Sequence, residues 1–116
     1  MRELLRFWVW LACLGCGTLQ ALTVTDDRQV QVTVDRAPQR IVSLLPSLSE
    51  TVCVLGACDR LVGVDRYSNW PQSVARLPHL GGLEDTQVEA LVRLKPDLVL
   101  LARSSRVTAR LESLGL

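Results

Sequence analysis

The residues best suited to bind another molecule stand in one short stretch, which reads Tyr67-Ser68-Asn69-Trp70. The chain contains only one Tyr, one Phe and three Trp, so this stretch holds two of its few aromatic residues. Aromatic faces beside a few polar groups suit a flat, largely apolar ligand. We therefore predict that Tyr67 and Trp70 contact a small ligand. An alternative for Trp70 is that its ring packs beneath its own loop.

Residues for catalysis or metal binding are poorly placed. His79 is the only histidine and has no partner ligands, so we expect a polar loop residue rather than a metal or haem ligand. Glu50 has no second carboxylate placed to assist hydrolysis and is interpreted as a helix cap. The turn at residues 45–48 lacks the glycines and the lysine of nucleotide-binding enzymes. We predict no enzyme, no cofactor and no metal.

Composition limits the partners further. The 116 residues carry a formal net charge of +1, and 48% of them are hydrophobic, which is typical of one small globular domain. The basic residues are almost all arginines and are scattered among acids rather than clustered. A nucleic-acid partner needs a basic patch, so none is expected.

The first 21 residues have the pattern of a signal peptide. Arg2 and Arg6 precede an apolar run at residues 7–14, and Ala21 offers a small residue for cleavage. We predict that residues 1–21 are removed and that the chain is exported. One alternative is a lipoprotein signal with Cys16 as the acylated residue, and another is an uncleaved anchor or buried helix.

Two cysteines, Cys53 and Cys58, would remain after cleavage. Their spacing is neither that of a redox pair nor that of a zinc site. Export to an oxidising compartment would allow them to form a disulfide. A structural disulfide and two buried free thiols are both compatible with the sequence.

Strand and turn patterns alternate with helical ones. Residues 22–34 alternate apolar and polar side chains on either side of Asp26-Asp27, which predicts a β-hairpin. Three later runs are almost wholly apolar, as in strands buried on both faces of a parallel sheet. These runs are Ile41–Leu45, Leu61–Val64 and Leu98–Leu101.

Helix signals lie between and after these strands. Ser47 with Glu50, and Thr86 with Glu89, have the spacing of a capping box and predict two helix starts. A short helix is expected at residues 72–76, and Ser105 is a candidate cap for a last helix.

The order of these elements predicts a three-layer, Rossmann-like α/β lobe with a parallel sheet. Ligands of such sheets bind beyond the carboxyl ends of the strands. Three segments are expected there: residues 46–50, 65–71 and 102–105. The chain stops where one more strand is expected, so we interpret residues 22–116 as a partial lobe.

Four sequence blocks resemble one known family. They are Pro-Gln-Arg-Ile-Val-Ser-Leu-Leu-Pro-Ser-Leu-Ser-Glu-Thr (38–51), Leu-Val-Gly-Val-Asp-Arg-Tyr-Ser-Asn-Trp-Pro (61–71), Gly-Gly (81–82) and Leu-Lys-Pro-Asp-Leu-Val-Leu (94–100). The chain is similar to the helical-backbone periplasmic binding proteins that deliver cobalamin, siderophores or haem to ABC importers. The Tyr-Ser-Asn-Trp-Pro loop is most similar to the cobalamin-binding branch. The resemblance implies a monomer that is the first lobe of a two-lobed protein.

The resemblance also implies a set of contacts. The ligand would be cobalamin or an iron chelate such as a ferric siderophore or haem, and the candidate ligand residues are Pro46, Ser47, Tyr67, Ser68, Asn69, Trp70 and Gly82. Glu89 matches a residue that docks onto the permease subunits of the importer, although it could act only as a helix cap. Two other interpretations stay open, a fragment of a Rossmann-like enzyme and a non-functional fragment.

Overall fold

The computed structural model describes residues 20–116. The predicted signal peptide, including Cys16, lies outside these residues except for its last two positions. Within the described part of the chain, no helix is both long and apolar enough to cross a bilayer.

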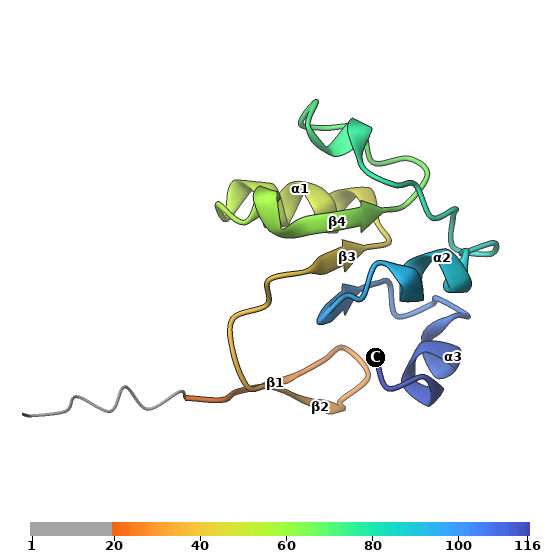
Figure 1. The fold of residues 1–116 in the computed structure, drawn as a ribbon. Helices are drawn as coiled ribbons and strands as arrows, with labels where there is room; N and C mark the ends of the chain where they lie inside the picture. The colour runs from red at the N-terminus through yellow and green to blue at the C-terminus, as the bar shows by residue number, and fades with distance from the viewer. Residues whose placement is uncertain (1–19) are drawn as a thin grey trace, which may run out of the picture.

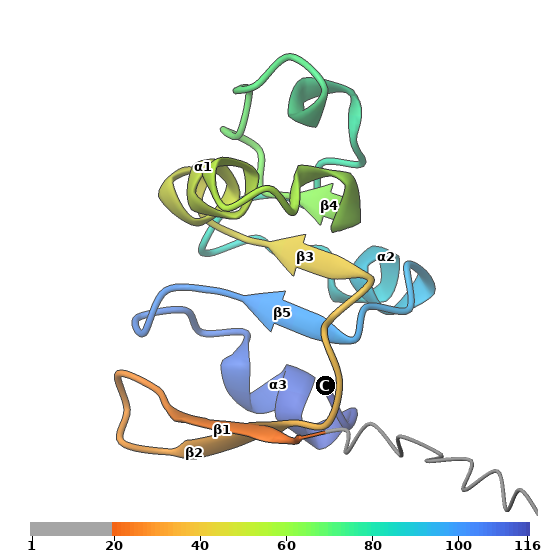
Figure 2. The same ribbon diagram turned by 90° about the vertical axis from the view of Figure 1, so that its left-hand side faces the viewer.

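The centre of the fold is the predicted parallel sheet, which Figure 2 shows as three arrows pointing the same way. The strand order is β4-β3-β5, and Ile41 of the central strand pairs with both Leu61 and Leu98. The three predicted strands are confirmed, but two of them are shorter than expected: β3 ends early because Pro46 already belongs to a helix, and β5 ends one residue early at Leu100. The bounds are β3 Ile41–Ser43, β4 Leu61–Val64 and β5 Leu98–Leu100.

Helices cover both faces of the sheet. Side chains alternate along a strand, so Ile41 and Val42 point to opposite faces. Ile41 belongs to a buried cluster with Val52 of α1 (Pro46–Val54). Val42 belongs to a second cluster with Leu91 of α2 (Val88–Arg93) and Leu111 of α3 (Thr108–Ser113). This is the predicted three-layer α/β lobe, seen from the side in Figure 1.

The predicted capping box at the start of α1 is wrong. The helix begins at Pro46, and its N-cap is Leu45 with no side-chain hydrogen bond. A proline suits the first turn because its fixed φ is already helical and its missing N–H would have no helical partner there. Glu50 therefore lies beyond the first turn as an exposed residue and caps nothing.

The other two predicted caps are wrong for the opposite reason. The N-cap of α2 is Gln87, while the Thr86 hydroxyl donates to the carbonyl of Gly82, 2.7 Å away. The N-cap of α3 is Val107, two residues after Ser105. In each case the chain turns into the helix one or more residues later than the polar side chain that could have capped it.

The predicted hairpin forms a separate two-stranded sheet of β1 (Leu22–Thr25) and β2 (Gln31–Val34). Its turn is built on Asp26, whose Oδ1 accepts the backbone N–H groups of Arg28 and Val30 at 2.8 and 2.9 Å. The bond from Val30, and next the Arg28 side chain, hold the pKa of Asp26 below its usual value. Both ribbon views place this hairpin at the end of the molecule away from α1 and β4.

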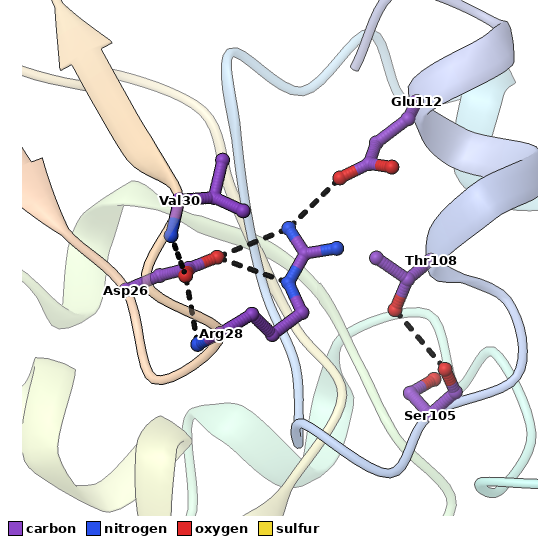
Figure 3. Close-up of polar contacts among 6 residues, drawn as sticks. All are labelled: Asp26, Arg28, Val30, Ser105, Thr108 and Glu112. Atoms are coloured by element: carbon purple, nitrogen blue, oxygen red, sulfur yellow. Dashed lines mark hydrogen bonds and ion pairs between the residues drawn. The ribbon is translucent and has the colours of Figure 1, made fainter.

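One arginine joins the hairpin to the body of the fold. Arg28 forms ion pairs with Asp26 at 3.0 Å and with Glu112 of α3 at 2.8 Å, as Figure 3 shows. The hydrogen bond to Glu112, followed by the one to Asp26, raises the pKa of Arg28. The guanidinium therefore bridges the two elements.

A disulfide joins Cys53 near the end of α1 to Cys58 at the start of the 3-10 turn η1 (Cys58–Arg60). Of the two alternatives left open by the sequence, the structure has the disulfide. The Cys58 sulfur lies 3.9 Å from the Ser73 hydroxyl. Ser73 immediately precedes a second 3-10 turn, η2 (Val74–Arg76), which forms within the short helix expected at residues 72–76.

Candidate ligand-binding site

A pocket of about 410 Å³ opens at the carboxyl ends of β3 and β4. Three segments line it: residues 44–46 after β3, residues 65–67 after β4, and residues 82–85 before α2. The chain leaves β3 toward α1 on one face of the sheet, and after β4 it passes through η2 before it reaches α2 on the other face. Such a divergence opens a crevice at the sheet edge, which is where ligands of open α/β sheets bind.

Tyr67 is the aromatic residue of this pocket. Its side chain is held at the pocket wall while the residue remains 64% exposed. Gly82 stands opposite, and a Cβ atom there would lie 3.7 Å from the Tyr67 ring. The preceding Gly81 has a φ of +94°, and a Cβ atom would collide with the carbonyl of Asp85. The two glycines thus form a tight turn and leave space beside the ring.

Ion pairs border the pocket. The Arg66 guanidinium pairs with Asp85, and the Gly82 N–H donates to the same carboxylate at 2.8 Å. The hydrogen bond from Gly82, and next the one from Arg66, hold the pKa of Asp85 below its usual range. Glu84 pairs with Arg106 at 3.1 Å. Glu84 and Asp85 are thus each paired with an arginine, and the third lining carboxylate, that of Asp65, is buried.

The structure brings together only part of the predicted site. Pro46, Tyr67 and Gly82 line the pocket. Ser47 and Asn69 are exposed outside it, and contact of either residue with a ligand stays a prediction. The segment at residues 102–105, expected at the same edge, does not contribute to the lining.

Trp70 is not part of the pocket wall. It is 54% exposed and precedes Pro71 through a cis peptide bond. A ring with half of its surface exposed does not pack fully beneath its own loop. Contact of Trp70 with a ligand also stays a prediction.

Ser68 is buried and does not line the pocket. It is 2% exposed, and its hydroxyl donates to Asp65 and lies 2.9 Å from the Ser49 hydroxyl. A buried side chain with these partners does not offer its hydroxyl to a ligand in the pocket. This residue was expected among the ligand contacts because it lies between Tyr67 and Asn69 in the sequence.

The segment at residues 83–85, with the acidic Glu84 and Asp85, was not expected to line the pocket. The sequence carried a signal for the turn, since glycine and aspartate are typical turn residues, but not for its place in the pocket. Arg66 was also missed. Its role at the pocket becomes visible only in the structure, where Asp85 lies beside it.

Two other candidate residues lie elsewhere. The exposed Glu89 pairs with Arg110 of α3 at 2.5 Å and does not cap α2, so the capping interpretation is wrong. The His79 ring nitrogen lies 3.1 Å from the carbonyl of Ala75 on the surface. Among residues 20–116, no group of three or more His, Cys, Asp or Glu side chains is arranged to hold a metal ion.

Comparison with known proteins gives a consistent result. A family profile described as "Periplasmic binding protein" matches residues 41–114. An uncharacterized ABC transporter substrate-binding lipoprotein of Bacillus subtilis (strain 168) is 38% identical over 84 residues, which is 72% of this chain and 26% of the relative.

Solved structures agree in fold. The periplasmic vitamin B12 binding protein of Vibrio cholerae has a TM-score of 0.64 and 32% identity, over 68% of this chain and 32% of that one. A periplasmic heme binding protein of Pseudomonas aeruginosa has a TM-score of 0.65 and 37% identity, over 69% of this chain and 30% of that one.

The chain thus spans about 26 to 32% of the length of these three relatives. The profile covers both sheet faces and the pocket, from β3 to α3. The family consists of non-enzymatic transport components, which excludes the Rossmann-like enzyme and agrees with the predicted lack of enzymatic activity. From its sequence blocks, its parallel sheet and this match together, the chain belongs to the periplasmic binding protein family.

Proposed function

We propose that this chain is part of the substrate-binding component of an ABC importer and that its pocket contributes to binding cobalamin. The observation that carries the proposal is the exposed Tyr67 ring in a pocket at the carboxyl ends of two parallel strands. One relative is named as an ABC transporter substrate-binding lipoprotein and another as a vitamin B12 binding protein. A planar corrin can stack on an exposed aromatic face with few polar contacts.

The charge of the pocket supports cobalamin over its rivals. Asp65, Glu84 and Asp85 line the pocket together with a single guanidinium, that of Arg66. The periphery of cobalamin carries mostly neutral amides, whereas haem carries two carboxylates and many ferric siderophores are anionic. The guanidinium of the lining, that of Arg66, is already paired with Asp85, so the lining residues offer no unpaired cation to bind the carboxylates of an anionic ligand. Haem remains the second candidate because of the similarity to the Pseudomonas aeruginosa protein.

Titration calorimetry of the full 116-residue chain with cyanocobalamin and haemin tests the proposal. Association costs an estimated 4 kcal/mol or more whatever the number of contacts, so a chain with under a third of its relatives' length should bind weakly. We expect a dissociation constant for cobalamin in the high micromolar range. Tighter binding of haemin than of cobalamin would contradict the cobalamin assignment. If neither ligand binds, the proposal that this pocket contributes to ligand binding is wrong.

Variants locate the binding. Tyr67→Ala should weaken cobalamin binding by roughly 1–3 kcal/mol, which is the scale of one packed aromatic contact. Leu22→Ala is the matched control, because it removes a large, 62% exposed side chain from the hairpin and not from the pocket. An equal loss in both variants would show that the binding is non-specific.

The location of the chain belongs to the same proposal. Named relatives are a periplasmic protein and a lipoprotein, which supports a periplasmic location of this chain after removal of residues 1–21. Mass spectrometry of the expressed protein distinguishes cleavage after Ala21 from acylation at Cys16. An intact Met1 in the cytosolic fraction would contradict both.

Docking to the permease is proposed at Glu89. Its carboxylate is exposed on α2, where its partner Arg110 is exposed as well. Exposed ion pairs of this kind contribute about 0–1 kcal/mol, so an arginine of a permease could replace Arg110 at little cost. Charge pairing across such an interface sets orientation and association rate.

A further inference from the structure

A buried chain of polar side chains lies directly beneath the loop that carries Tyr67. The Ser49 hydroxyl in α1 lies 2.9 Å from the hydroxyl of Ser43 at the end of β3 and 2.9 Å from that of Ser68 in the loop. The Ser68 hydroxyl donates to Asp65, which follows β4. All four side chains are at most 2% exposed. The network therefore joins two strand ends, one helix and the loop.

Proton counting shows which group orders this network. A carboxylate only accepts hydrogen bonds, while each serine hydroxyl has a single proton to donate. The Ser43 hydroxyl donates to the Leu45 carbonyl, the Ser49 hydroxyl donates to Ser43, and the Ser68 hydroxyl donates to Asp65. Asp65 is thus the acceptor that fixes the Ser68 hydroxyl. An asparagine in its place would keep only one acceptor oxygen, so it could not accept from both donors that Asp65 serves.

The second oxygen of Asp65 acts on Tyr67 itself. Asp65 Oδ2 accepts the backbone N–H of Tyr67 at 2.8 Å, and the backbone N–H of Asp65 donates to the Ser43 carbonyl at 3.0 Å. The backbone of Tyr67 is therefore fixed before the residue by Asp65 and after it by the buried Ser68 side chain. Its ring nevertheless stays 64% exposed in the pocket.

We propose that Asp65 and Ser68 are positioning residues, which hold Tyr67 in its binding orientation before any ligand arrives. Their hydrogen bonds fix the backbone on both sides of an exposed ring that has few packing contacts of its own. Rigidity before binding reduces the ordering cost of association. This inference rests on the proposed function for the role of Tyr67. In this inference Ser68 does not contact the ligand; it helps to position Tyr67, which does.

The composition of the chain allows a direct test. Tyr67 is its only tyrosine and Lys95 its only lysine, so labelling with [15N]Tyr and [15N]Lys gives one amide signal for each. The Lys95 N–H donates to the Val92 carbonyl at the end of α2 and reports on the fold away from the network. Hydrogen exchange of both amides is measured by NMR on the ligand-free chain, with Asp65→Asn as the main variant.

Asp65→Asn should accelerate exchange at Tyr67 about tenfold, because a charge-assisted bond is replaced by a neutral one. Ser68→Ala keeps the Asp65 carboxylate but removes the hydrogen bond that its Oδ1 accepts from Ser68. Hydrogen exchange at Tyr67 should therefore accelerate several-fold. The rate at Lys95 should not change. The matched controls are the exposed Asp59→Asn and Ser113→Ala, which should leave both rates within about twofold, well below the loss of one hydrogen bond.

Unchanged Tyr67 exchange in both variants would overturn the positioning role. Equal acceleration at Tyr67 and Lys95 would also overturn it, because the residues would then only stabilise the whole fold. These rates are measured without ligand, so they do not depend on the identity of the ligand. If the chemical shift of the Tyr67 amide does not change when cyanocobalamin is added, this counts against the proposed function, while the exchange result remains valid.

Discussion

The disulfide between Cys53 and Cys58 should contribute measurably to stability. It closes a small ring, since the two residues are five positions apart in the sequence. In the chain-entropy treatment, a ring of about six residues restricts the unfolded chain by about 2 kcal/mol at 25 °C. Replacing both cysteines by serine should lower the free energy of unfolding by that amount. The sheet should remain intact, because the disulfide lies beside α1 and not in the ladder.

Urea unfolding with and without a reductant provides the assay. The reductant should destabilise the natural chain by about 2 kcal/mol and leave the Cys53→Ser/Cys58→Ser variant unchanged. That variant is also the control for any effect of Cys13 and Cys16. A tryptic digest gives an independent check, because residues 41–60 form one peptide that contains both cysteines. Without reduction this peptide should be lighter by two hydrogens and should not react with iodoacetamide.

The reasoning would be refuted by an unreduced peptide that alkylates at both cysteines. It would equally be refuted if the disulfide formed but its reduction changed the free energy of unfolding by less than about 0.5 kcal/mol, far below the entropic estimate.

Three further predictions concern the core, the docking residue and the hairpin. Leu91→Ala removes a side chain with 0% exposure from the cluster below α2, and urea unfolding should show a loss of about 2–5 kcal/mol. Glu89→Gln should leave unfolding almost unchanged, since its pair with Arg110 is exposed, but should slow association with permease-containing vesicles. The pKa of Asp26 is lowered by the Val30 N–H, so its contribution to stability is present above the ordinary value of 3.8 and is lost as the pH falls through the folded value. NMR of the Val30 amide during an acid titration should show that bond weakening only at low pH.

The sheet could be predicted from the sequence because its signals are local. Short apolar runs of strand length, separated by helical periods, occur in the chain in the order that parallel strands require. Leu61–Val64 has the predicted bounds, and the hairpin turn forms at the predicted acids. The strand starting at Ile41 ends earlier than predicted, because the helix begins at Pro46.

The helix caps and the pocket could not be predicted to the same extent. A capping box is only one possible use of a serine near a helix start, and Ser49 shows another, a bond to Ser68, 19 residues away. The charged rim of the pocket depends on Arg66 meeting Asp85, also 19 residues away. Contacts of this length depend on how strands and loops stack in space, which residue spacing does not determine.

The N-terminal hairpin has consequences for how the molecule opens. Leu22 and Val24 are 62% and 45% exposed, and no residue that lines the pocket belongs to β1 or β2. A two-stranded sheet with little burial is marginally stable by itself. We therefore expect the hairpin to open locally at a lower free energy than global unfolding requires. Opening would break the ion pair between Arg28 and Glu112, while β3 and the pocket remain folded. Residues 22–34 are thus a suitable place for a spectroscopic probe or an immobilisation tag.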